Sequence, residues 1–340
     1  MKYTNALQGK SLICTQDWKK EELDLVLDLA LAMKENRYDH HLKDCLKNRT
    51  FFMFFYNPSV RTRQSFEAAA TELGGHAQFL EPKSMRLKTE KTAGETIEDA
   101  AKVMSRYAVG LGVRILEDKI PYYGAGEALI REYEQFSSIP VFSMAHDKYH
   151  PFQGLADIMG LKEHLQELKG KKVLMVWGHG GLARSWCSVQ EHLLIASRFG
   201  MSVRLAYPRG YDLDSDVIEK TKKNCENNSQ EFSITHDMDE AYKDVHVVYS
   251  RNWMSPEAYQ DGEFHKPSEI EKAMKHKEWI CDEEKMKLTS HALFIHPMPV
   301  DRGNEVTDGV ASSSRSIIYD VAENRLHVQK AVMALTMGKY

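Results

Sequence analysis

Short apolar runs alternate along this 340-residue chain with stretches whose apolar residues recur at helical spacing. The run TFFMFFY at 50–56 is almost wholly apolar, which is typical of a strand buried on both faces of a parallel sheet. A second alternation begins with KVLMVW at 172–177. Strands that alternate with helices in both halves predict an α/β protein of two domains, each a central parallel sheet flanked by helices.

The same patterns predict the remaining elements. We expect strands at 76–80, 109–114, 140–144, 203–207, 232–235, 245–250 and 292–296. We expect helices at 18–36, 63–73, 95–107, 152–168, 217–227, 239–243 and 323–337, with one more that leads from the glycine-rich loop after 177 to Phe199. Asp17 is the expected cap of the first helix.

The long helix that Pro151 opens is expected to join the two halves. This divides the chain into a first domain at residues 1–150 and a second at residues 151–322. The segment 323–340 is expected to be a C-terminal helix that packs back on the first domain.

Composition excludes several classes of protein. The net charge of −4 gives no general attraction to nucleic acid or to an anionic membrane. No apolar run is long enough to span a bilayer, and the N-terminus lacks the apolar core of a signal peptide. The five cysteines are scattered without CxxC spacing, so we expect neither a disulfide framework nor a zinc site, but reduced thiols in a cytoplasmic protein.

The segment NPSVRTRQSF at 57–66 follows the first buried strand and begins a helix. Ser59, Arg61, Thr62 and Arg63 fall in its first turn. Backbone N–H groups, hydroxyls and a guanidinium at a helix N-terminus bind a phosphate dianion, and cations placed there without an anion oppose the helix dipole. The alternative is a capped helix with arginines that face solvent.

Other polar residues lie where strands end, which is where ligands bind in parallel sheets. His150 and Gln153 stand together at a helix start, and together they can donate to and accept from a small carbonyl or amide. Arg114 ends the strand VGLGVR. The rigid loop HPMP at 296–299 follows the last strand. Each of these features alone also fits an ordinary loop residue, ion pair or turn.

A glycine-rich loop, Gly178 to Ala183, fits G-x-G-x-x-A after a strand and before a helix, which is the pattern of a dinucleotide site. No acid ends the next strand to hold a ribose, although Arg209 could serve a 2′-phosphate. An NADP-dependent oxidoreductase is therefore the alternative function that this loop leaves open.

Four motifs together resemble the aspartate/ornithine carbamoyltransferase family. NPSVRTRQSFE is similar to the family's S-x-R-T-R motif, HPFQGLADIMGLKEH to its H-P-x-Q helix, HPMP to its H-C-L-P or H-P-L-P loop, and AENRLHVQKA to its closing helix. They occur in the family's order over nearly the whole chain. The resemblance implies a carbamoyl phosphate domain followed by an amine-substrate domain.

The resemblance also implies site residues and an assembly. It assigns carbamoyl phosphate to one set of positions: Ser59, Val60, Arg61, Thr62, Lys88, Arg114, His150, Gln153, Pro297, Met298 and Arg325. Of these, Lys88 lies in the loop that the family shares with a neighbouring subunit, in a homotrimer with active sites between subunits. No cofactor, metal, nucleic acid or membrane is implied.

The implied chemistry needs only these groups. A neutral amine attacks the carbonyl of carbamoyl phosphate, and Arg61, Thr62 and His150 stabilise the oxyanion as the catalytic residues. Arg61, Arg114 and Arg325 then meet the charge of the departing phosphate. Orientation and preorganised electrostatics supply the rate.

At the positions expected to bind the amine substrate, the sequence differs from the best-known members of the family. Gly178 to Leu182 stands where ornithine enzymes have G-D-G-N-N, and Arg251 lies in the segment where they carry an aspartate. An arginine there predicts a substrate that bears a carboxylate, bound by Arg251 and by Arg302, with Met254 alongside. Asp301 could receive a second ammonium group, as in a diamino acid. An inactive family member that serves as a binding subunit is the remaining alternative.

Overall fold

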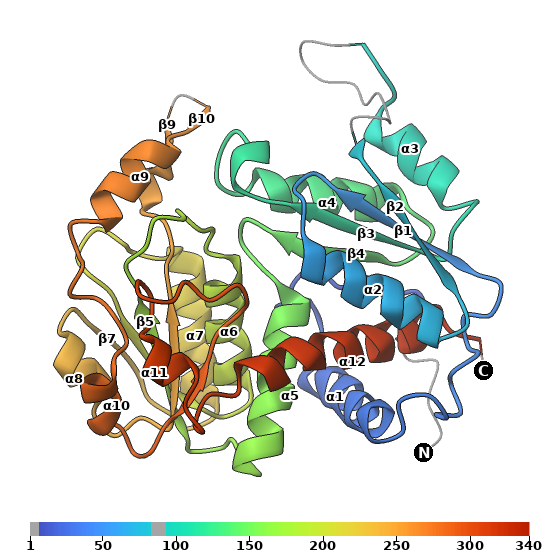
Figure 1. Ribbon diagram of the computed structural model, residues 1–340. Coiled ribbons are helices and arrows are strands. Elements are labelled where there is room, and N and C mark those ends of the chain that lie inside the picture. Colours follow the sequence, from blue (N-terminus) through green and yellow to red (C-terminus); the bar gives the residue numbers. More distant parts are fainter. Residues whose placement is uncertain (1–6, 83–92, 261, 340) are drawn as a thin grey trace. The chain divides into compact units, whose positions relative to one another are not determined.

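The computed structural model describes residues 7–82, 93–260 and 262–339. It divides into two compact units (Figure 1). Unit 1 contains the chain up to Leu155 together with the segment from Asn324 onward, and unit 2 contains Ala156–Glu323. The chain passes between the units within α5 (Pro151–Leu165) and within α12 (Ile318–Met337).

Unit 1 is built on a four-stranded parallel sheet in the order β2-β1-β3-β4. Its strands are β1 (Thr50–Phe55), β2 (His76–Leu80), β3 (Gly110–Ile115) and β4 (Val141–His146). All five residues from Phe51 to Phe55 are buried, as expected for a strand with neighbours on both sides and helices on both faces. The segment around Leu12 adds a short parallel bridge to the free edge of β4.

The helices of unit 1 follow from the handedness of parallel connections. They are η2 (Thr15–Asp17), α1 (Lys20–Glu35), α2 (Val60–Glu72), α3 (Ile97–Met104), η4 (Glu117–Lys119) and α4 (Ala125–Phe136). The connection through α2 leads from β1 to the edge strand β2. The connections through α3 and α4 lead in the opposite direction across the sheet, from β2 to β3 and from β3 to β4. Right-handed crossovers therefore place α2 on one face of the sheet and α3 and α4 on the other, as Figure 1 shows. The strand order reverses between β1 and β3.

Unit 2 contains a five-stranded parallel sheet in the order β11-β8-β5-β6-β7. Its strands are β5 (Lys172–Trp177), β6 (Ser202–Ala206), β7 (Phe232–Thr235), β8 (Val247–Arg251) and β11 (Leu293–Ile295). Here the order reverses between β5 and β8. Both sheets thus contain the topological switch point at which parallel sheets bind ligands.

The helices of unit 2 are again distributed by strand order. They are α6 (Cys187–Arg198), α7 (Ser215–Asn227), α8 (Met238–Tyr242), η5 (Pro256–Ala258), α9 (Lys266–Ala273), α10 (Glu283–Lys287) and α11 (Asp308–Ala311). The first two pack side by side on one face, and α8 with α10 lies on the other. A small hairpin of β9 (Tyr259–Gln260) and β10 (Glu263–Phe264) precedes α9.

The predicted fold class is confirmed, with two α/β units built on parallel sheets. Among the elements, α4 was missed, and its N-terminus explains why. Its N-cap residue is Gly124, which has no side chain to cap it, and the buried carboxylate of Asp147 accepts the N–H groups of Gly124 and Glu127 instead. A cap supplied from beyond the next strand leaves no local signal in the sequence.

Two local predictions were wrong. Asp17 does not cap α1, whose N-cap residue is Lys19. The Asp17 carboxylate instead accepts the N–H of Cys14 at 3.2 Å and pairs with Arg131 at 2.8 Å. In addition, the helix expected from residue 63 begins at Val60, since Ser59 caps it.

A buried ammonium joins α12 to α2 and to the turn that follows α1. The Lys330 side chain is 2% exposed and pairs with Glu72 of α2 at 2.8 Å. It also donates to the carbonyl of Arg37 at 2.9 Å, and the Arg37 guanidinium binds Glu72 from the other side. Since each charge has a partner, this network fixes α12 against the sheet-covering helix.

Replacing Lys330 with Met should lower the free energy of unfolding by about 3 kcal/mol, because the Glu72 carboxylate loses a buried partner. Lys43→Met removes an ammonium from an exposed pair with Asp39 and should change it by less than about 0.5 kcal/mol. Chemical denaturation of both variants measures the difference. Equal losses would show that burial does not set the strength of the Lys330 pair.

Candidate functional site

The turn between β1 and α2 presents hydroxyl and amide groups at the switch point of unit 1. Ser59 is the N-cap of α2, and its Oγ accepts the N–H of Thr62 at 3.4 Å. Thr62 is buried, whereas Val60 is exposed. The structure thus places a capped helix N-terminus at the carboxyl end of a buried strand, and the binding of an anion there remains a prediction.

The two arginines of this turn have different surroundings. Arg63 pairs with Glu67 at 2.9 Å and lies over the ring of Phe79 at 4.1 Å, so the protein itself accounts for its charge. Arg61 is exposed and forms no ion pair with any residue that the structure describes. The protein shields part of the side chain from water, and this desolvation lowers the pKa of Arg61. No carboxylate offsets the effect. Of the two arginines in this turn, Arg61 is therefore the one whose charge has no partner among the described residues.

Two further basic residues belong to the same edge of unit 1. The buried Arg325 of α12 donates from Nη2 to the Oγ1 of Thr62 at 2.8 Å. Arg114 lies near the end of β3, where it is in register with Phe55 of β1, and its carbonyl accepts the N–H of Tyr56 at 2.9 Å. The fold therefore brings Ser59, Thr62 and Arg325 together and places Arg114 on the adjacent strand end.

Asn57 connects the two strand ends, and the sequence analysis gave it no role. Its buried side chain accepts the N–H of Leu116 at 2.7 Å and donates to Asp118 at 2.9 Å. One amide thus holds the turn after β1 to the loop after β3. Its position two residues before the S-x-R-T-R motif is the only sequence signal for this role.

His150 and Gln153 lie beyond the carboxyl end of β4, at the start of α5. The His150 carbonyl accepts the N–H groups of Gln153 at 2.9 Å and Gly154 at 3.1 Å, so His150 begins the helix. Both side chains are buried. Lys88 lies outside the residues that the structure describes, and its assignment remains a prediction.

In unit 2, the carboxyl ends of β5, β8 and β11 are neighbours in the sheet. Arg251 ends β8 and is 9% exposed. Its guanidinium donates from Nη1 to the carbonyl of Pro297 at 3.3 Å. Its Nε has no hydrogen-bond partner among the described residues. The HPMP loop, in which the Met298–Pro299 peptide is cis, thus lies against the arginine predicted to bind a carboxylate.

The fully buried carboxylate of Glu305 organises these loops, and the sequence analysis missed it. Its Oε1 accepts the N–H of Asn252 at 2.8 Å, and its Oε2 accepts the N–H of Asp301 at 3.0 Å. His296 Nε2 lies 2.8 Å from Oε2, and Arg184 Nε lies 3.4 Å from Oε1. Only the fold reveals this residue, because its partners come from three different loops.

The charge of Glu305 is stabilised by its neighbours. Burial by itself would raise the pKa of Glu305, but the hydrogen bond and charge of His296, together with Arg184 and Arg251, lower it to about 2. Burial lowers the pKa of His296 in spite of the carboxylate beside it. At neutral pH the carboxylate is therefore ionised and balances the two guanidiniums.

The glycine-rich loop serves the packing of Glu305 and does not open a helix. A Cβ at Gly178 would lie 3.0 Å from Cα of Glu305, so a side chain there would displace it. Helix α6 begins only at Cys187, and the expectation of a helix directly after the loop was wrong. A dinucleotide site needs the helix N-terminus at the glycines, so this loop lacks the geometry that the alternative function requires.

Two predicted amine-site residues are engaged by the protein. Arg302 donates to the Asp308 carboxylate at 3.0 Å and to the Ser312 hydroxyl at 2.7 Å. Met254 is buried, and its backbone binds Arg184 and the indole of Trp186. Their roles toward a substrate remain predictions.

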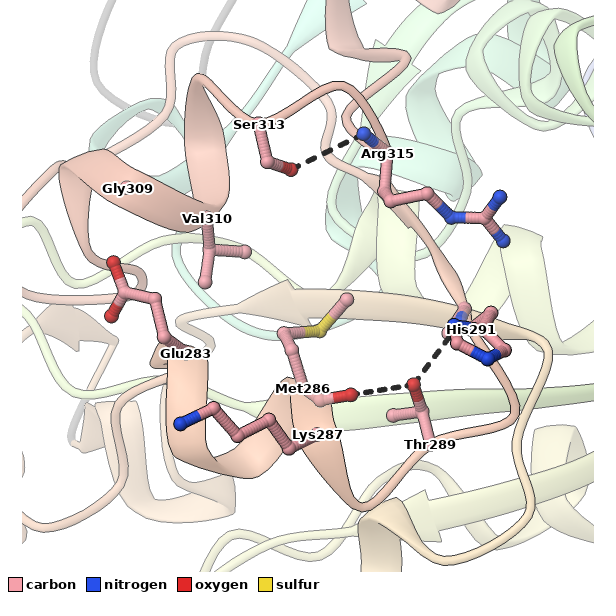
Figure 2. A pocket seen from close by; sticks show the side chains of 10 residues that line it. Glu283, Met286, Lys287, Thr289, His291, Gly309, Val310, Ser313 and Arg315 are labelled. Atoms are coloured by element: carbon pink, nitrogen blue, oxygen red, sulfur yellow. Dashed lines mark hydrogen bonds between the residues drawn. The ribbon is translucent and has the colours of Figure 1, made fainter.

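A hollow of about 430 Å³ lies elsewhere in unit 2 (Figure 2). Met286, Ala292 and Val310 form its apolar part, and Lys287 and Arg315 are among its polar lining residues. His291 and Ala292 precede β11, whereas Pro297 and Met298 follow it. The hollow is therefore at the amino edge of the sheet, opposite the edge where the loops around Glu305 meet.

Within the described ranges, no helix is both long enough and apolar enough to cross a membrane. The same residues contain no cluster of three or more histidine, cysteine, aspartate or glutamate side chains placed to hold a metal ion. All five cysteines are buried, and none of them forms a disulfide.

Glu305→Gln should destabilise the protein at pH 7 by about 3 kcal/mol, the equivalent of its pKa difference between the folded and unfolded chain. A folded-state pKa below the ordinary value of 4.5 gives stability that is present above that pH and is lost as the pH falls toward 2. Wild type should therefore lose stability more steeply than the variant between pH 5 and 2.

Urea unfolding at a series of pH values measures both effects. Glu284→Gln, at a side chain that is 77% exposed, is the matched control and should follow the wild-type curve. Parallel curves for wild type and Glu305→Gln would contradict the assignment of a buried, ionised carboxylate.

Comparison with known proteins agrees with this geometry. Residues 10–163 match the model of the aspartate/ornithine carbamoyltransferase carbamoyl-P binding domain, and residues 169–336 match that of the Asp/Orn binding domain. N-acetylornithine carbamoyltransferase of Xylella fastidiosa is 35% identical over 96% of this chain and 98% of its own length. Ornithine carbamoyltransferase of Pyrococcus abyssi is 34% identical over 98% and 97%.

Solved structures give the same result. An acetylornithine transcarbamylase complexed with acetylcitrulline superposes with a TM-score of 0.89 at 33% identity, covering 97% of this chain and all of its own. A variant of N-acetyl-L-ornithine transcarbamylase complexed with carbamyl phosphate and N-succinyl-L-norvaline gives 0.88 at 33% identity, over 96% and 99%. The chain belongs to the aspartate/ornithine carbamoyltransferase family.

Proposed function

We propose that this carbamoyltransferase moves the carbamoyl group of carbamoyl phosphate to the amine of an amino acid, or amino acid derivative, that bears a carboxylate. Unit 1 binds carbamoyl phosphate, and unit 2 binds the amine. The observation that carries the proposal is the turn after β1, where a capped helix N-terminus, the Thr62–Arg325 hydrogen bond and an arginine without a carboxylate partner meet.

This turn suits a phosphate dianion. Ser59 and Val60 supply backbone and hydroxyl groups at the start of α2, and Arg61 supplies the unpaired charge. Arg114 and Arg325 add guanidiniums from β3 and α12, where a planar fork binds two phosphate oxygens. Since Thr62 already holds the buried Arg325 guanidinium, this cation needs little reorganisation when the substrate binds.

The reaction follows from the chemistry of carbamoyl phosphate. The neutral amine nitrogen attacks the carbonyl carbon, and Arg61, Thr62 and His150 stabilise the oxyanion that forms. The bond between carbon and the phosphate oxygen then breaks, phosphate leaves with the electron pair, and the nitrogen loses its proton. Gln153 and the carbonyls of Pro297 and Met298 are the proposed partners of the carbamoyl oxygen and NH₂.

Arg251 is the proposed ligand of the substrate carboxylate. Its guanidinium is buried at the end of β8, and the one hydrogen bond that it donates to a described residue goes to a neutral carbonyl. A carboxylate ligand would satisfy the remaining donors bidentately. The family's homotrimer, with Lys88 reaching a neighbouring subunit, and the cytoplasmic location belong to this proposal, and light scattering of the purified protein tests the first.

Arg61→Ala should abolish measurable binding of carbamoyl phosphate, since it removes the charge that nothing else in the described chain balances. Arg63→Ala is the matched control, because Glu67 and Phe79 already engage Arg63, and its affinity should stay within about threefold of wild type. Isothermal titration calorimetry measures both. Near-normal binding by Arg61→Ala would refute the phosphate assignment.

Asn57→Asp should raise the KM for carbamoyl phosphate by about tenfold or more, because two carboxylates would then oppose each other at the Asp118 contact and separate the two strand-end loops. The double variant Asn57→Asp/Asp118→Asn restores one donor and two acceptors in reversed positions. It should recover most of the wild-type KM, whereas Asp118→Asn alone should not improve on wild type.

Steady-state kinetics with each substrate varied in turn measures this. The KM for the amine should change less than that for carbamoyl phosphate, which a general loss of folding would not produce. A double variant as impaired as Asn57→Asp would contradict the positioning role of Asn57.

A further inference from the structure

The hollow of about 430 Å³ in unit 2 takes no part in the proposed chemistry, because it lies at the amino edge of the sheet. It is enclosed by α10, by the loop at 289–292 that leads into β11, and by α11 with the loop at 313–315 that follows it. Figure 2 shows Met286 and Val310 in its middle. An apolar hollow of this size with a few polar groups around it is typical of sites for small molecules.

One side of the hollow carries two basic groups. Figure 2 shows the Arg315 guanidinium and the His291 imidazole on the same side of Met286 and Val310. Neither side chain forms an ion pair or a hydrogen bond with any residue that the structure describes. The protein therefore leaves a guanidinium without an anion at the rim of an apolar hollow.

The backbone that carries these two groups is fixed by the sheet. The Arg315 carbonyl accepts the N–H of Phe294 at 2.9 Å, which ties its segment to the outer edge of β11. His291 lies in the left-handed region with a φ of 51°, which few residues other than glycine adopt. The N–H of Ser290 before it donates to the carbonyl of Val245 at 2.9 Å. Both basic residues thus start from backbone that needs no rearrangement.

The neighbouring part of the amino edge is also basic. His246 precedes β8, the strand that pairs with β11. Burial, and then the positive charges of Lys171 and Lys172, lower the pKa of His246, while Asp244 acts in the opposite direction. Neither lysine forms an ion pair within the described ranges of the chain. This edge of the sheet therefore favours a ligand with negative charge.

The other side of the hollow is occupied by interactions within the protein. Lys287 pairs with Glu284 at 2.5 Å. Glu283 accepts the Thr307 hydroxyl at 3.1 Å, and its other oxygen lies against Gly309, where a Cβ would collide with it. The negative charge of Glu283 would repel an anion from this side, so the ligand's anionic group belongs on the opposite side.

We propose that the hollow is a second binding site of this protein, for a small carboxylate with an apolar body. Arg315 binds the carboxylate through its planar fork, and His291 donates a hydrogen bond to it. The apolar body covers Met286 and Val310, which removes their surface from water. This inference goes beyond the proposed function, since no step of carbamoyl transfer uses these residues.

The second site shares α11 with the loop that carries Arg302. The Asp308 carboxylate and the Ser312 hydroxyl, at the two ends of this helix, bind Arg302 at 3.0 and 2.7 Å. Gly309 and Val310, between them, line the hollow. A bound carboxylate therefore contacts the helix that holds a residue proposed for the amine site, and it should suppress local opening of that helix.

Titrations of the full chain, followed by ligand-observed NMR, test the site with benzoate, 3-phenylpropionate and 3-methylbutanoate. At least one of these carboxylates should bind with a Kd of about 1 mM or tighter. Its neutral amide, which lacks the charge, and acetate, which lacks the apolar body, should each bind about fivefold or more weakly.

Two variants locate the bound carboxylate. Arg315→Gln should weaken binding by about fivefold or more, whereas Arg209→Gln, at another exposed and unpaired arginine of unit 2, should leave it unchanged. Hydrogen exchange, measured with the carboxylate at saturation, should slow at residues 289–292 and 308–312 in wild type. The same dose should not slow exchange there in Arg315→Gln.

Three results would overturn the second site. The first is that none of the three carboxylates binds, and the second is that the amides bind as tightly as the carboxylates. The third is equal affinity of wild type and Arg315→Gln, or protection confined to the carboxyl-end loops, since the carboxylate would then lie elsewhere. The comparison of carboxylate with amide uses wild type alone, so it stands even if a variant misfolds.

Discussion

The reversal of strand order within each parallel sheet is the constraint on which the candidate site depends. Between β1 and β3, and again between β5 and β8, the connecting helices leave on opposite faces, so the loops at the carboxyl ends separate and expose a place for a ligand. The turn before α2 and the end of β3 occupy the first of these places, and the glycine-rich loop and the end of β8 occupy the second. Topology therefore selects which polar residues can act together before any side chain is considered.

The two places handle charge in opposite ways. In unit 1, Arg61 has no carboxylate partner in the described chain, and we propose that the phosphate of the substrate supplies the anion. In unit 2, the buried Glu305 offsets Arg184 and accepts the backbone N–H groups of Asn252, which follows Arg251, and of Asp301. A single carboxylate there allows guanidiniums to remain buried, because each charge is hydrogen-bonded or paired. The proposed amine site therefore contains both a buried guanidinium and a carboxylate.

Much of the architecture was predictable, since it rests on local patterns. The strands β2, β5 and β7 have the bounds expected from their apolar runs, and Ser59 caps α2 at the predicted motif. Several predictions failed where the stabilising group is distant in sequence. Helix α4 is capped by Asp147 from beyond β4, and Asn57 and Glu305 act through partners on other loops. No periodicity or spacing records such contacts.

The sequence by itself determined the class of fold, the Ser59-capped turn before α2 and the family, because these depend on apolar periodicity and on residues that are neighbours along the chain. Only the tertiary structure decided which arginines form ion pairs within the protein and which do not. The sequence does not distinguish Arg61 from Arg63. In the structure, Arg63 contacts Glu67 and Phe79, whereas Arg61 contacts neither. The same holds in unit 2, where Asp308 binds Arg302 while Asp301 has no cation of the described chain beside it. The pairing of side chains in the folded chain leaves certain charged groups without a partner, and we propose that these groups bind the substrates.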